Sequence, residues 1–242
     1  MLLDFHKTAG SPAPPTPTLS RGVCVEVAGA KLRGALDVPP DARGLVLFAS
    51  NRDFARIEPR QSGLARDLNR HGLGTLLFDL VDSADGPEVA GDVDLLTERL
   101  LAATAWSGRQ WGVEGLPIGY AGSGLGTAAA LSAAAILGSK VDAVASHSGR
   151  PDLAVADLGE VSAPTLLVVD GDDAPLAATN ALAAARLRCP HRLREVAASA
   201  AQAGTWAATP AICRWMEWHL GSPEVPYEPH WAGSATIAAP LS

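Results

Sequence analysis

Residues 116–127 read LPIGYAGSGLGT, and residues 128–138 continue with AAALSAAAILG. The first part begins as a short apolar run, which predicts a buried strand over 116–122. The second part is rich in alanine, which predicts a helix over 126–138. Glycine recurs between them and indicates a sharp turn, with the helix packed closely on the strand. A strand that passes through a tight turn into a helix is typical of α/β proteins.

The rest of the chain repeats this unit on both sides of that stretch. Short apolar runs predict strands buried on both faces, and amphipathic stretches predict the helices between them. The expected strands are 44–49, 75–80, 141–146, 163–171 and 191–197, and the expected helices are 59–72, 93–108, 174–187 and 209–221. Residues 22–38 add two further strands joined by a turn. The alternation predicts an α/β fold, with a mostly parallel central sheet and helices on both faces.

Length and composition favour one folded domain with extended ends. The chain has 242 residues, of which 48% are hydrophobic and 19% charged, so a sizeable core can form. We expect the domain to cover residues 22–221, with a proline-rich arm over 1–21 and a proline-rich tail over 222–242. Tyr227 and Trp231 in the tail are unusual for a pure linker. Two interpretations stay open, a lid over the site and a contact with a partner subunit.

Charge and cysteine usage narrow the partners and the compartment. The formal net charge is −7 and Lys and Arg form no run, which argues against nucleic acid or a membrane surface as partner. The start of the chain, MLLDFHKTAG, does not have the pattern of a signal peptide. The thiols show no metal-binding spacing and indicate a reduced, cytoplasmic protein: Cys24, Cys189 and Cys213. We expect no metal and no cofactor, a small-molecule ligand or a partner protein, and leave a homo-oligomer open.

The glycine-rich turn allows two functional interpretations. In a nucleophile elbow the reactive residue has glycine two positions before and two positions after it. Only Gly124 meets this condition, between Gly122 and Gly126, whereas Ser123 stands one position before the apex. The alternative is a phosphate-binding turn, but Thr127 stands where the third glycine of G-x-G-x-x-G is required. A third interpretation is purely structural, the close packing of a helix on the sheet.

Beyond this turn, the chain resembles the dienelactone hydrolase-like branch of the α/β-hydrolases over residues 22–220. The resemblance rests on the order of elements and on the segments GLVLFA, TLLFDL, LPIGYAGSGLGTAAAL, SGRPDL, APTLLVVDGDD and RLREV. It implies the α/β-hydrolase fold. In such sheets ligands bind beyond the carboxyl ends of the strands, which is where we look for the site.

The resemblance also implies where the catalytic features of the family fall. Members carry a His-Gly step after the first parallel strand, a nucleophile at the elbow, an aspartate in a late loop and a histidine after the last strand. Here these positions hold Ser50-Asn51, Gly124, Asp173 and Gln202. Only the aspartate is kept. Acyl transfer needs both a nucleophile and a base, so the chain is not expected to be an ordinary Ser-His-Asp hydrolase. Asp173 either serves another reaction or caps a helix.

Other side chains at strand ends complete the candidate site. Ser50, Asn51, Asp79, Ser146 and Leu125 are expected to line a ligand. His147 is the only histidine at the carboxyl end of an expected strand, so it is a candidate for a relocated base. The plainer alternative is a loop histidine that bonds the backbone. With Ser123 and Asp173, His147 makes up the tentative catalytic set.

Three functions therefore remain open, and enzymatic activity itself is undecided. The first is a non-hydrolytic enzyme, for cyclisation, isomerisation or a similar reaction in the old cavity. The second is a pseudoenzyme that serves as a binding or assembly module. The third is a hydrolase with an unusual nucleophile, Ser123 or a cysteine, for which the sequence supplies no evident base.

Overall fold

The computed structural model describes residues 18–27, 30–50, 59–197 and 207–221. Within them lies an eight-stranded sheet with the order β1-β2-β4-β3-β5-β6-β7-β8. The strands are β1 (Leu19–Val27), β2 (Ala30–Val38), β3 (Leu45–Ser50), β4 (Gly74–Asp79), β5 (Ile118–Gly124), β6 (Ala143–Gly149), β7 (Thr165–Asp170) and β8 (His191–Val196). The helices are α1 (Pro59–Arg70), α2 (Val93–Ser107), α3 (Leu125–Leu137), α4 (Ala174–Ala184) and α5 (Thr209–Leu220).

The sheet is mostly parallel, as the alternation of strands and helices predicts. β1 and β2 form an antiparallel pair, and β2 joins β4 antiparallel. All other neighbouring strands, from β4 through β3 to β8, run parallel. Every residue of β3 and of β4 is buried, because helices cover both faces of the central strands. The carboxyl ends of these parallel strands consequently meet at one edge of the sheet.

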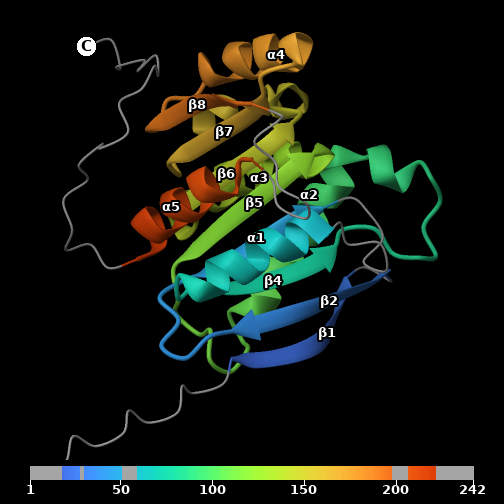
Figure 1. Ribbon diagram of the computed structural model, residues 1–242. Coiled ribbons are helices and arrows are strands. Elements are labelled where there is room, and N and C mark those ends of the chain that lie inside the picture. The colour runs from blue at the N-terminus through green and yellow to red at the C-terminus, as the bar shows by residue number, and fades with distance from the viewer. Residues whose placement is uncertain (1–17, 28–29, 51–58, 198–206, 222–242) are drawn as a thin grey trace, which may run out of the picture.

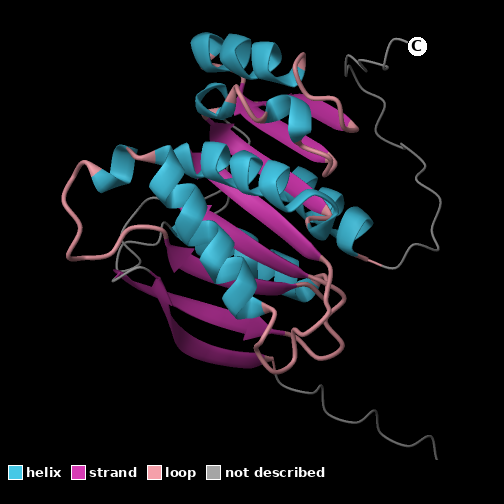
Figure 2. Ribbon diagram, turned by 180° about the vertical axis from the view of Figure 1, so that it is seen from behind, coloured by secondary structure: helices cyan, strands magenta, loops and turns pink. Residues whose placement is uncertain are grey.

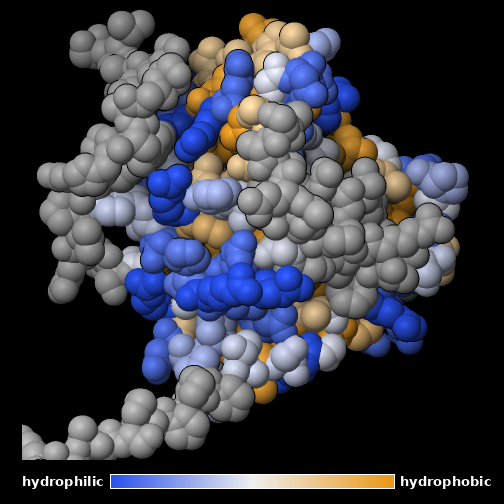
Figure 3. Space-filling view, in the orientation of Figure 1, coloured by the Kyte–Doolittle hydropathy of each residue, from blue (hydrophilic) through white to orange (hydrophobic). Residues whose placement is uncertain are grey.

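Two helical layers cover the sheet. α1 and α5 pack against each other and lie on the face turned to the viewer in Figure 1. α2, α3 and α4 cover the opposite face, which Figure 2 shows in front. The outer side of α1 is hydrophilic (Figure 3), while Leu64 and Leu68 on its inner side are completely buried. Trp215 and Met216 of α5 join the same core cluster, so these large side chains contribute to packing.

Most elements differ by one to three residues from their expected limits, β1, β5 and β6 among them. β1 begins at Leu19, inside the expected arm, because its residues pair with β2 from Leu19 opposite Val38 onward. β5 continues through Gly124 and α3 starts at the next residue, so the turn between them is tighter than expected. β6 extends to Gly149, because His147 pairs with Ser123 of β5, and Gly124 pairs with Gly149 after a one-residue irregularity.

Short 3-10 helices fill some connections: η2 (Val89–Gly91), η3 (Gly138–Lys140), η4 (Pro151–Ala154) and η5 (Leu158–Glu160). Two of them, η4 and η5, follow β6 and pack on α3. Among the described helices, none is both long and apolar enough to cross a membrane.

Candidate functional site

The junction of β5 and α3 has the geometry of a strained elbow. Gly124 adopts φ 52° and ψ −129°, a backbone conformation that L side chains rarely take. A Cβ at Gly122 would come 2.8 Å from the Cα of Thr127, and one at Gly126 would come 2.0 Å from the carbonyl oxygen of Ala49. Both contacts are closer than real Cβ atoms allow, so glycine is required on either side of the apex. The chain reverses at Gly124 because its neighbours leave room for strand and helix to touch.

The apex itself is open but carries no side chain. A Cβ built on Gly124 would meet no atom of the described residues within 4 Å. The carbonyl oxygen of Gly124 accepts a hydrogen bond of 2.9 Å from the backbone N–H of Arg150, which ties the end of β6 to the elbow. The position therefore has space for a reactive group, yet a glycine offers neither a hydroxyl nor a thiol.

Ser123 and His147 lie side by side at the edge of the sheet. They face each other in the register of β5 and β6. Two residues earlier on the same strands, Ala121 and Ala145 belong to the core under α1 and α5. Because strand residues alternate between faces, Ser123 and His147 project to that same side. Ser123 is half-buried, and His147 is only 6% exposed.

The imidazole of His147 is held by a carboxylate on the next strand. Its Nε2 lies 3.1 Å from Oδ1 of Asp170, the last residue of β7. The other oxygen of the same carboxylate, Oδ2, accepts a hydrogen bond of 2.9 Å from the hydroxyl of Ser148. Ser148 has a φ of 48°, in the left-handed region that few non-glycine residues adopt. The Asp170 carboxylate thus contacts the side chains of both His147 and Ser148, and the backbone of Ser148 is strained.

Asp170 and Ser148 were missed in the sequence, although one signal was available. Asp170 closes the apolar run TLLVVD of β7 just as Asp79 closes TLLFD of β4. Asp79 was chosen because it ends an expected strand, and Asp170 ends one in the same way. No comparable signal marks Ser148, since its role follows from its backbone conformation and its distance to Asp170.

Asp173 follows Asp170 in a turn, in which its backbone N–H donates to the carbonyl oxygen of Asp170 over 3.1 Å, and its side chain caps a helix. Its carboxylate accepts a hydrogen bond of 3.0 Å from the backbone N–H of Leu176, in the first turn of α4. Asp173 is exposed, as is its neighbour Asp172. The capping role that the sequence left open is therefore present, and the carboxylate that pairs with His147 is Asp170.

The expected ligand-lining residues separate into two groups. Ser50 and Asp79 end neighbouring strands opposite each other, each 4% exposed, and Leu125 is the half-buried first residue of α3. Ser146 does not join them. It is completely buried and pairs in register with Leu167, which belongs to the core under α3. Asn51 and Gln202 lie outside the described residues.

The thiols lie in positions that do not suit a nucleophile. Cys213 is buried in α5, and burial raises the pKa of its thiol to about 12. Burial also raises the pKa of Cys189, which precedes the amino end of β8. Cys24 is exposed on the edge strand β1. The described ranges contain no group of three or more His, Cys, Asp or Glu side chains that could hold a metal ion.

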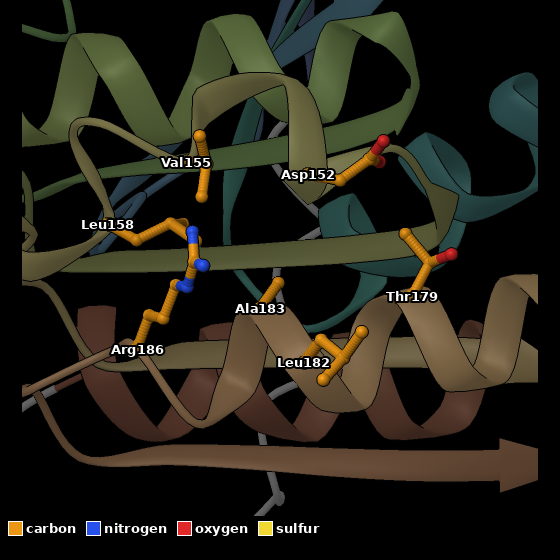
Figure 4. A pocket seen from close by; sticks show the side chains of 7 residues that line it. All are labelled: Asp152, Val155, Leu158, Thr179, Leu182, Ala183 and Arg186. Atoms are coloured by element: carbon orange, nitrogen blue, oxygen red, sulfur yellow. The ribbon is translucent and has the colours of Figure 1, made fainter.

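A small pocket lies on the outer flank of the molecule. It has a volume of about 260 Å³ and runs between α4 and the short helices η4 and η5. Arg186 reaches toward Leu158 at one end, while Asp152 and Thr179 lie at the other (Figure 4). Its lining contains no pairing of a nucleophile with a base, so the pocket is separate in chemistry from the strand-end cluster.

The glycine elbow, the parallel sheet and its two helical layers define an α/β-hydrolase fold, as expected, and solved structures agree. The crystal structure of a dienelactone hydrolase from Anabaena variabilis is 35% identical to this chain. It superposes with a TM-score of 0.74 over 84% of this chain and 98% of that one. Est1E from Butyrivibrio proteoclasticus superposes with a TM-score of 0.69 at 14% identity, over 83% of this chain and 99% of that one. The chain belongs to the dienelactone hydrolase family.

The sequence matches no protein-family model. Among curated proteins, two from strains of Mycobacterium tuberculosis are 40% identical over 173 residues, and both are named "Putative phosphoribosyl transferase". The matched stretch is 70% of this chain but only 39% of those proteins. The chain therefore corresponds to about two-fifths of the length of these relatives.

Proposed function

We propose that this member of the dienelactone hydrolase family has lost serine-hydrolase chemistry and works as a non-hydrolytic enzyme at the carboxyl edge of its sheet. The observation that carries the proposal is Gly124. Its φ of 52° and its two tightly packed glycine neighbours match the apex of an elbow, the place of the nucleophile in this fold. A glycine there cannot form an acyl-enzyme.

The acid and base positions support the same proposal. The Asp173 carboxylate is engaged by the backbone of α4 instead of orienting an imidazole. The family resemblance places the base on Gln202, and an amide side chain does not take up a proton near neutral pH. Removing the nucleophile or the base alone forfeits most of the rate advantage of a catalytic triad. The three family positions together thus do not support hydrolysis.

A site without a nucleophile can still accelerate certain reactions. Orientation of the substrate and stabilisation of developing charge suffice when the substrate itself supplies every atom of the product. Isomerisation and cyclisation meet this condition, since neither needs a covalent intermediate with the protein. The name of the Anabaena variabilis relative points to unsaturated lactones as the substrate class. We therefore assign such lactones, or the open-chain acids that close to them, as the candidate substrates.

A second candidate function is a pseudoenzyme that serves as an assembly module. It is favoured by the relatives from Mycobacterium tuberculosis, in which the matched stretch is 39% of a longer protein named "Putative phosphoribosyl transferase". A domain that accompanies another activity can be retained for binding alone. In this case the partner would be a phosphoribosyl transferase, present in the same chain or as a separate one.

The test uses a fluorophosphonate probe, which labels activated serine hydroxyls. The purified chain is compared with a Gly124→Ser/Gln202→His variant, which restores nucleophile and base at the family positions. We expect no labelling of the unchanged protein and labelling of the variant at the introduced hydroxyl, because the apex has room for a side chain. Asp173 remains available as the acid, although it caps α4.

The opposite results are equally informative. Labelling of the unchanged chain, at Ser123 or any other hydroxyl, would contradict the loss of hydrolase chemistry, and mass spectrometry of the labelled peptide would identify the nucleophile. Turnover of short aryl esters by the unchanged chain would do the same. A matched Ser123→Ala variant then separates a true nucleophile from a neighbouring residue.

A further inference from the structure

We infer that the outer face of α4 is a contact between two copies of this chain, which pair with their α4 helices antiparallel about a twofold axis. The inference goes beyond the proposed function, because it concerns the flank of the molecule and does not depend on the chemistry at the elbow. α4 packs against β7 and the edge strand β8, at the outer end of the sheet (Figure 1). Three independent features of this flank carry the inference.

The first feature is a group of exposed apolar side chains. Among the described residues five large apolar side chains are exposed, and three of them lie on α4 or at η4, which packs against α4. Leu182 of α4 is 73% exposed, while Leu153 and Val155 at η4 are 43% and 44% exposed. Leu182 and Val155 border the pocket of Figure 4, whose lining also contains the buried Leu158 and Ala183. Grouped apolar side chains on a surface are typical of a contact with another protein.

The second feature is that α4 has no charged outer face. Its sequence, APLAATNALAA, contains no charged residue, although Ala178, Ala181 and Leu182 on its outer side are exposed. Figure 3 shows hydrophobic residues at its surface. By contrast, α2 on the same side of the sheet carries Asp94 and Glu98 at exposed positions, as a helix that faces water usually does. The outer face of α4 therefore has the composition of a helix face that packs against another surface.

The third feature is the opposite charge at the two ends of α4. Asp172 and Asp173 precede the helix and Arg186 follows it, and all three are exposed. In an antiparallel pair the end of each helix lies beside the start of the other, so Arg186 of each copy faces the two carboxylates of the other copy. A parallel pair would place like charges together, which is unfavourable. Because the surface is complementary to itself, its partner is a second copy of this chain.

The charge of the whole chain favours the same face. With a formal net charge of −7, two copies repel each other at most orientations. Positions 174–185 carry no charge, so the copies can approach along α4 with little repulsion. Removal of Leu153, Val155 and Leu182 from water then stabilises the pair. The charges at the two ends of the helix fix its orientation more than they add to its affinity.

Sedimentation velocity of the full-length protein tests the inference, over about a 100-fold range of concentration. We expect a dimer whose share rises with concentration. Leu182→Asp should weaken the association by about 100-fold or more, because the substitution introduces a carboxylate on both sides of a symmetric apolar contact. Trp111→Asp is the matched control. Trp111 is also 73% exposed but lies in the loop between α2 and β5, so its substitution should leave the dimer unchanged.

Two charge-reversal variants test the antiparallel arrangement. Arg186→Asp and Asp172→Arg should each weaken the dimer, because each places like charges opposite one another. Mixing the two variants should restore the association, since opposite charges then face each other at both ends of the helix pair. Mixing does not repair a folding defect, so recovery reports on the contact itself. Asp172 is chosen because Asp173 also caps α4.

Three results would overturn the inference. The first is a monomer at every concentration, which would leave the outer face of α4 to a different protein or to another segment of this chain. The second is a dimer that persists in Leu182→Asp, which would place the contact elsewhere. The third is a mixture of the two charge-reversal variants that associates no better than either alone. Circular dichroism of each variant excludes unfolding as the cause of a loss.

Discussion

At the scale of single residues, His219 connects burial to the pH dependence of stability. Its ring packs edge-on against Trp215, with centroids 4.4 Å apart. Burial lowers the pKa of His219 from 6.5 to about 4. Between these two values the unfolded chain binds the proton more readily than the folded chain does. The free energy of unfolding should consequently fall as the pH drops through this window, and the full penalty should be present below it.

This expectation is checked by urea unfolding at roughly pH 7 and pH 5, for the unchanged protein and for His219→Phe. The phenylalanine keeps an aromatic ring against Trp215 but cannot be protonated, so the variant should lose less stability on acidification. His71→Gln serves as the control, because His71 is half exposed beside Glu217. Equal losses in the unchanged protein and in His219→Phe would show that His219 does not carry the effect.

At the scale of elements, the junction of β5 and α3 depends on the close approach of strand and helix. A Cβ at position 126 would come 2.0 Å from the Ala49 carbonyl oxygen, so Gly126→Ala forces β3 and α3 apart. We expect a loss of about 3 kcal/mol in the free energy of unfolding, at the upper end of overpacking effects. Gly22→Ala is the control, since a Cβ there meets nothing within 4 Å in the part of the chain that the structure describes. It should change stability by less than about 0.5 kcal/mol.

The elements also show what the sequence can and cannot supply. The alternation of apolar runs and amphipathic stretches predicts the strands and helices, because a strand that is buried on both faces consists almost entirely of apolar residues. The end of β6 shows no such pattern, since His147-Ser148-Gly149 is not an apolar run. It belongs to the strand through pairing alone, of His147 with both β5 and β7 and of Gly149 with β5. Spatial order is hidden in the same way: β4 lies between β2 and β3, so neighbours in the sheet are not neighbours in the chain.

One part of the candidate site can be predicted from the sequence and the other cannot. The glycine spacing around Gly124 is a property of adjacent residues and can be read directly. The contact of His147 with Asp170 joins residues 23 positions apart, and nothing in either local sequence favours it over Asp173. Only the parallel pairing of β6 with β7 brings the two side chains to one edge of the sheet.

At the scale of the whole molecule, one ion pair joins the amino-terminal strands to the helical layer. Arg99 of α2 contacts Asp85 over 2.5 Å and donates to the carbonyl oxygen of Leu80 over 2.7 Å, just after β4. The side chains of Arg99 and Asp85 are only 7% and 15% exposed. In the same loop, Asp82 accepts a hydrogen bond of 2.5 Å from the backbone N–H of Lys31 in β2. β2, β4 and α2 are thus held by one polar network.

Acid should weaken this network in a defined pH range. The hydrogen bond from Arg99 lowers the pKa of Asp85 below its ordinary value of 3.8. Because the folded state holds the ionised carboxylate more tightly, its stabilising effect is complete above that value and is lost as the pH falls through the lowered pKa. Near neutral pH, Arg99→Met leaves the partly buried Asp85 carboxylate without its partner and should cost about 3 kcal/mol. In Asp85→Asn, the free energy of unfolding measured with urea should fall less on acidification than in the unchanged protein. An equal fall in both proteins would show that Asp85 does not cause the acid sensitivity.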